Sequence, residues 1–138
     1  MGYWGNAPWD NDYAADWFGA VVDETKIGDV IDRTLSKSVD CFNCDEIRGA
    51  ISLFILMGRV YVYDIYKLGD HLERCILKNL ELKKFWSEGG WDGDPEVGQW
   101  LDFELAVLQR RANNVGVPEK ERPAITSEMK DWWAKWID

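Results

Sequence analysis

The stretch that decides the fold is the apolar run "DEIRGAISLFILMG" at residues 45–58. Its large apolar side chains recur three or four positions apart, which places them on one face of an α-helix: Ile47, Ile51, Phe54 and Ile55. Residues 51–57 are apolar at every position except one serine, so such a helix would be buried on nearly all sides. The run is far too short to span a bilayer. We therefore predict that it forms the central helix of a helical domain.

Helical patterns continue on both sides of this run. Apolar spacing predicts further helices over residues 12–22, 26–37, 68–85 and 94–113, and a short last helix from 126 or 127. The one β-like stretch, "VYVYDIY" at residues 60–66, has no partner with which to form a sheet. We predict a single compact all-α domain of five to six helices over residues 1–138, with residues 117–124 as a linker to the last helix.

Composition and charge restrict the function. The chain has 138 residues, of which 46% are hydrophobic, and a formal net charge of −9. This acidity argues against nucleic acid or an anionic membrane as the ligand, and favours a basic protein partner or a cation. The first residues lack the basic start and apolar run of a signal peptide, and three cysteines cannot all pair with one another. We therefore expect a cytoplasmic protein.

The N-terminal stretch "MGYWGNAPWDNDYAADW", residues 1–17, is rich in aromatic and short polar side chains. Its glycines and proline predict an irregular segment over residues 1–10, and Asp10, Asn11 or Asp12 would cap the helix that follows. We expect this segment to pack on the bundle as a lid, its indole N–H groups donating to Asp12 or Asp16. The predicted structural motif comprises Trp4, Trp9, Asn11, Asp12, Asp16 and Trp17. The alternative is a cation site, but the pattern of a calcium loop is broken at Ala14 and Ala15.

The same stretch resembles the start of a bacterial family known as domain of unknown function 4259. That family opens with Met-Gly-x-Trp-Gly, an aromatic residue, and then Asn-Asp-x-Ala-x-Asp-Trp or Asp-Phe. The matching positions here are Met1, Gly2, Trp4, Gly5, Trp9, Asn11, Asp12, Ala14, Asp16 and Trp17. The resemblance implies a small, mostly helical bacterial domain, and it transfers no catalytic residue.

Two pairs of residues contain side chains that could bind a metal ion. Cys41 and Cys44 form a C-x-x-C pair, and His71 and Cys75 would share a helix face, so the four could hold one structural zinc ion. The alternative is that Cys75 is a small apolar residue of the helix face and that His71 is a surface residue. We favour no bound cofactor, with zinc as the alternative.

Two further regions have both a structural and a functional interpretation. Asp92, Asp94 and Glu96 lie in the acidic loop "GGWDGDPE", where Asp94 and the following proline are typical of a helix start rather than of a cation site. The last helix carries Trp132, Trp133 and Trp136, which either dock it on the core or form a contact surface for a partner. Sequence signatures of nucleophilic, phosphate-binding or zinc-protease sites are absent from the 138 residues.

These observations favour a non-enzymatic protein-interaction module. Its concrete form is an immunity-type or antitoxin-type protein, whose acidic face would cover the basic cleft of a nuclease toxin. The alternative is a metal-binding protein or metal-dependent enzyme that uses either the cysteine and histidine set or the N-terminal carboxylates. A third possibility is a module that functions as a homo-oligomer.

Overall fold

Six α-helices account for most of the chain in the computed structural model. The structure describes residue 8 and residues 11–137, without the side chains of residues 119, 136 and 137. The helices are α1 (Asp12–Thr25), α2 (Ile27–Leu35), α3 (Cys44–Met57), α4 (Ile65–Ser87), α5 (Pro95–Asn114) and α6 (Ser127–Ile137). Two short 3₁₀ turns, η1 (Gly90–Gly93) and η2 (Glu119–Glu121), lie before and after α5. The described residues contain no β-strand and form one all-α domain, as predicted.

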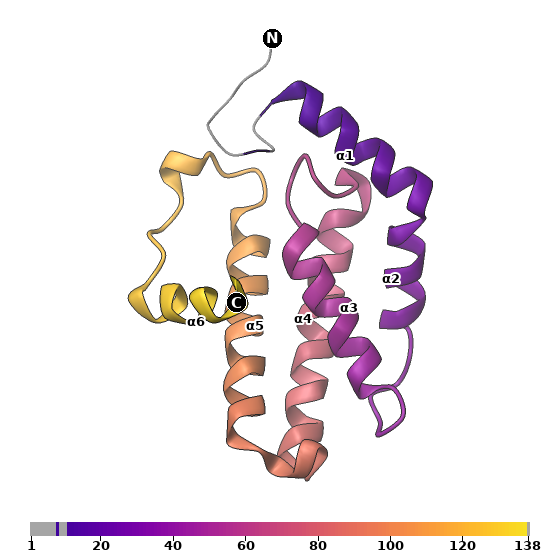
Figure 1. The fold of residues 1–138 in the computed structure, drawn as a ribbon, viewed down its shortest axis with the longest axis vertical. Coiled ribbons are helices and arrows are strands. Elements are labelled where there is room, and N and C mark those ends of the chain that lie inside the picture. The colour runs from indigo at the N-terminus through magenta and orange to yellow at the C-terminus, as the bar shows by residue number, and fades with distance from the viewer. Residues whose placement is uncertain (1–7, 9–10, 138) are drawn as a thin grey trace.

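The two longest helices, α4 and α5, form an antiparallel pair that runs the length of the molecule (Figure 1). The indole Nε1 of Trp86, in the last turn of α4, donates to the backbone oxygen of Asp94, at 2.7 Å. Gly98 allows this close approach, since a Cβ at that position would lie 2.6 Å from the Trp86 ring. Asp94 also caps α5, because its side chain accepts from the backbone N–H of Glu96 at 2.9 Å. The predicted helix start is therefore confirmed.

α3 lies at the centre of the core. Ile47, Ile51, Phe54 and Ile55 are each 0% exposed and pack with apolar residues of α2, α4 and α5. The half-buried guanidinium of Arg111, on α5, donates to the backbone oxygens of Phe54 and Ile55 in the last turn of α3, and the Phe54 oxygen also accepts from the backbone N–H of Gly58. The central position predicted for this helix is confirmed.

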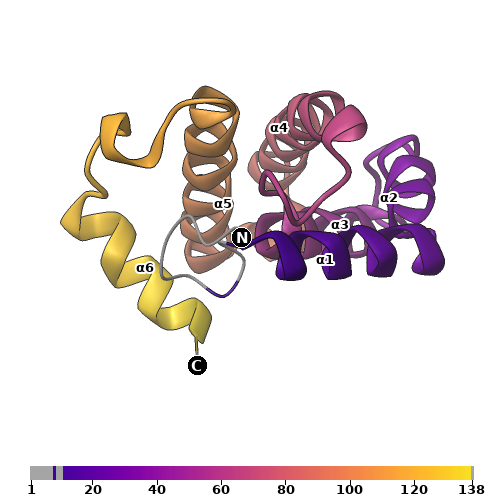
Figure 2. The same cartoon turned by 90° about the horizontal axis from the view of Figure 1, so that it is seen from above.

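α1 lies on the outside of the bundle, and α2 follows it after a sharp turn at Lys26 (Figures 1 and 2). Asn11 caps α1, as predicted, because its Oδ1 accepts from the backbone N–H of Ala14 at 2.8 Å. Lys26 joins the two helices in the left-handed conformation, with φ of 56°. Val22 is the one buried residue of α1, so this helix contributes little to the core.

The stretch from residue 60 to residue 66 is a turn followed by the start of α4. Val62 and Tyr63 are both buried although they are neighbours in sequence, whereas a strand would place them on opposite faces. Asp64 accepts from the backbone N–H of Tyr66 at 2.9 Å and caps α4, which therefore begins three residues before the predicted start. None of the helices in the described part is long and apolar enough to cross a membrane.

Candidate functional site

The outer side of α1 carries exposed aromatic and acidic side chains. Tyr13 is 78% exposed and Trp17 is 62% exposed, and Asp16 and Glu24 are exposed as well. The helical repeat of 3.6 residues brings these four positions onto one face, which we call the acidic face of α1. Two further aspartates flank it, and residues 12–25 contain no lysine or arginine. An exposed face with this composition can bind a cationic partner.

The predicted N-terminal lid involves residues that the structure does not describe. Trp4 and Trp9 are among them, so the lid stays a prediction. Asp16, however, is exposed, and no residue of the described ranges donates a hydrogen bond to its carboxylate. The reason is its position, since the inner face of α1 is formed by Ala14, Phe18 and Val22, and Asp16 points away from that face. Trp17 is also on the outer face rather than among the inner apolar residues.

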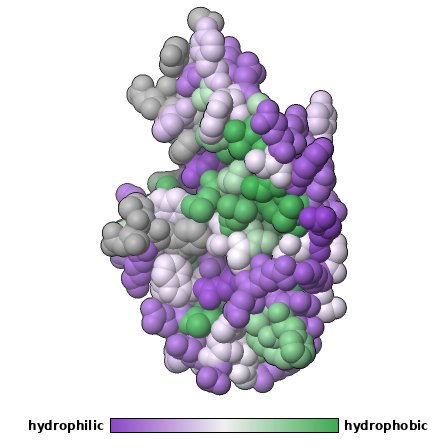
Figure 3. All heavy atoms as spheres, turned by 45° about the vertical axis from the view of Figure 1, so that its right-hand side comes forward, coloured by the Kyte–Doolittle hydropathy of each residue, from purple (hydrophilic) through white to green (hydrophobic). Residues whose placement is uncertain are grey.

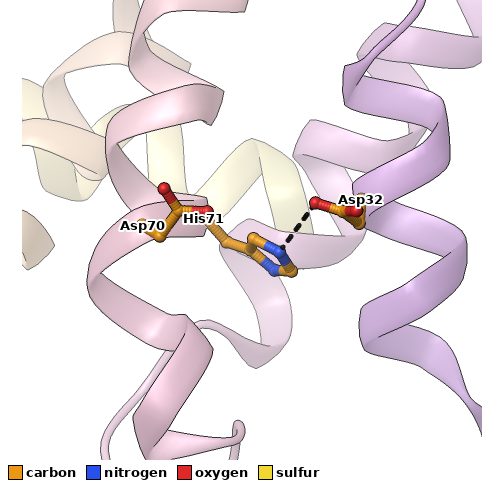
Figure 4. A group of neighbouring side chains, drawn as sticks. All are labelled: Asp32, Asp70 and His71. Carbon is orange, nitrogen blue, oxygen red and sulfur yellow. Dashed lines mark ion pairs between the residues drawn. The ribbon is translucent and has the colours of Figure 1, made fainter.

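The only histidine is buried and connects two helices. His71, on α4, is 2% exposed, its Nδ1 lies 2.6 Å from the hydroxyl of Tyr63, and its Nε2 lies 3.5 Å from Asp32 Oδ1 on α2 (Figure 4). A proton on Nε2 satisfies both contacts, because Tyr63 then donates and Asp32 accepts. Burial lowers the pKa of His71, which favours the neutral imidazole. The predicted alternative of a surface histidine is therefore wrong for His71.

The Asp32, Asp70 and His71 ligand atoms lie within 4.8 Å of one another, so they form a group that could be considered for a metal. Arg74 argues against that use. Its guanidinium pairs with Asp32, lies 3.9 Å from Asp70 Oδ2, and lowers the pKa of Asp32. A fixed positive charge thus already lies between the two carboxylates. The Tyr63 hydroxyl is buried and already paired with His71 Nδ1, so we interpret the network as a structural connection between α2 and α4.

The structure does not bring together the predicted zinc ligands. Cys41 is exposed, whereas Cys44 and Cys75 are buried in the core cluster. Burial raises the pKa of Cys75 to about 12, which opposes the thiolate that zinc requires. Within the described ranges, the one group of three neighbouring ligand atoms is the aspartate and histidine group above. Zinc binding stays a prediction, which a metal content well below one equivalent in protein purified without added zinc would contradict.

The C-terminal tryptophans described in the structure pack against α5. The Trp132 ring lies 5.0 Å from the Trp100 ring and is stacked 5.9 Å from the Phe103 ring, and Trp133 lies 6.3 Å from Phe103. Trp132 and Trp133 therefore dock α6 on α5, which is the first of the two arrangements predicted for this helix. The side chain of Trp136 lies outside the described part, and the use of this helix as a contact surface stays a prediction.

A groove with a buried carboxylate lies between α3, α5 and α6. Its volume is about 480 Å³, and it is lined by Asp45, Arg48, Gly49, Ser52, Trp100, Glu104 and Lys135. We call it the Glu104 groove. Glu104 is 3% exposed, and its Oε1 accepts from Arg48 Nη2 at 3.2 Å. Its volume is within the range of small-molecule sites, and it combines an aromatic wall with converging charges.

The acidic loop between α4 and α5 supports one wall of this groove. Trp91 has φ of 51° and Asp92 has φ of 56°, a backbone conformation that non-glycine residues rarely adopt. The turn directs the Trp91 indole toward α3, where its Nε1 donates to Asp45 Oδ1 at 2.8 Å. The Arg48 guanidinium lies 5.8 Å from the centre of the Trp91 ring. The loop thus positions two groove residues.

Sequence reasoning missed the Glu104 groove, because its residues come from three helices that are distant in the chain. One signal could have indicated it. Glu104 occupies a position three residues after Leu101 and four before Leu108, where the apolar face of α5 predicts another apolar side chain. A carboxylate at such a position needs a partner, and Arg48 supplies one.

Comparisons of this chain with protein-family models, with curated proteins and with solved structures find no match. The resemblance of the N-terminal stretch to the domain of unknown function 4259 family therefore stays a prediction.

Proposed function

We propose that the protein is a non-enzymatic binding module whose acidic face of α1 contacts a basic segment of a partner protein. The observation that carries this proposal is the exposure of Tyr13 and Trp17 on a helix with four carboxylates and no cationic side chain. Burying exposed aromatic side chains contributes strongly to association, and tryptophan and tyrosine are enriched among the residues that dominate binding energy.

The chemistry of the face fits a lysine-rich or arginine-rich segment. A partner cation can pair with Asp16 or Glu24 while it lies over the ring of the neighbouring Trp17. Figure 3 shows apolar surface in the middle of the side that brings α1 and α2 forward, with hydrophilic surface around it. Val30, Leu53 and Leu56, on α2 and α3, are among the exposed apolar residues. An apolar centre with a polar rim is the usual composition of a protein interface.

The concrete form of the proposal is an immunity-type or antitoxin-type protein in the bacterial cytoplasm. A nuclease has a basic cleft for its phosphate backbone substrate, and an acidic face can cover such a cleft. The net charge of −9 would accelerate that association and would make it depend on ionic strength.

The test is a binding measurement with an identified partner. The tagged protein is used to capture proteins from a lysate of its source, the captured protein is identified and purified, and its Kd is measured by calorimetry. We expect Trp17→Ser and Asp16→Lys each to raise the Kd at least about tenfold. Glu73→Lys, an equal charge change at an exposed position of α4, is the matched control and should change it little. Capture of no protein, or equal weakening by Asp16→Lys and Glu73→Lys, would contradict the proposal.

A further inference from the structure

Glu104, which lines the groove, has one carboxylate oxygen that lacks a hydrogen-bond donor among the described residues. Arg48 donates to Oε1 of Glu104, but Oε2 is buried and has no donor among the described residues. A buried acceptor without a donor costs free energy, and more so when it carries charge. Burial also raises the pKa of Glu104, with Arg48 opposing that shift. A ligand in the groove that supplies an N–H donor would remove this cost.

The lining of the groove also includes the cation of Lys135, on α6. In the described part of the chain, the Lys135 ammonium has one partner, the Trp132 ring, whose centre lies 4.0 Å from Nζ. No carboxylate or carbonyl of the described residues pairs with it. Lys135 is exposed on α6 and is therefore available to an anionic group of a ligand.

The charges of the groove balance. Asp45 and Glu104 supply two negative charges, and Arg48 and Lys135 supply two positive charges. A ligand with a single net charge, such as an amine or a lysine of a partner protein, would be attracted by one pair and repelled by the other. A zwitterion can satisfy both kinds of group without changing the net charge. Trp100 supplies an aromatic wall against which an apolar side chain can pack.

We propose that the Glu104 groove binds a small zwitterion of the α-amino acid class, with its ammonium group at Glu104 Oε2 and its carboxylate at Lys135. This site is separate from the acidic face of α1, and the inference does not rest on the proposed protein partner. Arg48 keeps its pair with Glu104 Oε1, so it holds the carboxylate in place while the ligand uses the second oxygen.

Three matched probes test the charge requirement. L-phenylalanine carries both groups, phenethylamine lacks the carboxylate, and 3-phenylpropanoate lacks the ammonium group. Each is titrated into the ¹⁵N-labelled protein, and backbone amide shifts are followed by NMR. We expect L-phenylalanine to shift amides of Arg48, Ser52 and Glu104 and to bind about tenfold more tightly than either analogue, since each analogue loses one ion pair.

Variants separate this site from nonspecific binding. Lys135→Met should reduce the affinity for L-phenylalanine to that for phenethylamine, because it removes only the partner of the carboxylate. Lys130→Met, at another exposed position of the same helix, is the control and should leave the affinity unchanged. Glu104→Gln should weaken binding of L-phenylalanine at least about tenfold in protein that retains its fold by circular dichroism.

The proposal is overturned by either of two results. If millimolar L-phenylalanine shifts none of the groove amides, the groove does not bind the zwitterion. If phenethylamine binds as tightly as L-phenylalanine and Lys135→Met has no effect, the groove is a plain cation site. Neither result depends on whether α1 binds a protein partner.

Discussion

α1 and α3 have the same length of 14 residues, yet they have opposite roles. α3 buries five residues and is surrounded by α2, α4 and α5, whereas α1 buries only Val22. Both segments are rich in apolar side chains in the sequence. The difference is where these side chains lie, since the inner face of α1 consists of Ala14, Phe18 and Val22 while its largest aromatic ring, on Trp17, faces outward. An apolar helix can therefore supply either stability or a binding surface.

The largest effect should come from the core side of this comparison. Phe54, on α3, is 0% exposed and packs edge-on against Tyr63, with ring centres 4.8 Å apart. Phe54→Ala would remove this contact and leave a cavity next to His71, so we expect a loss of about 3–5 kcal/mol in the free energy of unfolding. Urea denaturation followed by circular dichroism measures it.

The control is on the same helix. Leu56 is 54% exposed, and Leu56→Ala should cost less than about 1 kcal/mol because little apolar surface returns to water. Equal losses for the two variants would mean that α3 is not the central helix.

The sequence predicts which face of each helix is buried, but it does not predict how much of α1 is buried. The spacing of Ile47, Ile51 and Phe54 determines which face of α3 is buried, and its nearly continuous apolar run indicates burial on several sides. In α1 the spacing of Phe18 and Val22 gives the inner face, but it does not say how much surface covers that face. How much of the inner face is buried depends on where α1 packs against the rest of the bundle.

The buried connection between α2 and α4 should contribute an effect of intermediate size to stability. Burial lowers the pKa of His71 in the folded protein below its ordinary value of 6.5, although Asp32 opposes the shift. The stability from the neutral imidazole is therefore fully present above pH 6.5 and is lost as the pH falls through the folded pKa. We expect the free energy of unfolding to decline between neutral and mildly acidic pH.

His71→Gln distinguishes this cause from others. The paired carboxylates Asp29 and Asp32 have lowered pKa values, so they lose their contribution only at more acidic pH, below their ordinary value of 3.8. The variant should be less stable at neutral pH but should lack the decline that begins near pH 6.5. If the free energy of unfolding of His71→Gln declines over the same pH range as that of the wild type, the decline is caused by a group other than His71.

The sites were harder to predict than the helices, for a physical reason. Asp94 and Asn11 act on neighbouring backbone N–H groups, so their capping roles follow from local sequence and were predicted correctly. Glu104 and His71 depend on partners that are tens of residues away in the chain, Arg48 and Asp32. Pairing over such distances is set by how helices pack, which the spacing within one helix does not determine.

The smallest effect on stability should come from the outer face of α1. An Asp16 that held a lid in place would cost about 1–3 kcal/mol when removed, because a buried donor would lose its acceptor. The exposed Asp16 accepts no hydrogen bond from the described residues, so we expect Asp16→Asn to change the free energy of unfolding by less than about 0.5 kcal/mol. The same urea denaturation measures it, with Phe54→Ala as the positive control. A loss above 1 kcal/mol would support the lid interpretation, since it would require a donor to Asp16 from residues 1–7, 9 or 10. An unchanged free energy of unfolding together with weakened partner binding would assign Asp16 to the interface. α1 would then supply a binding surface, whereas α3 supplies stability.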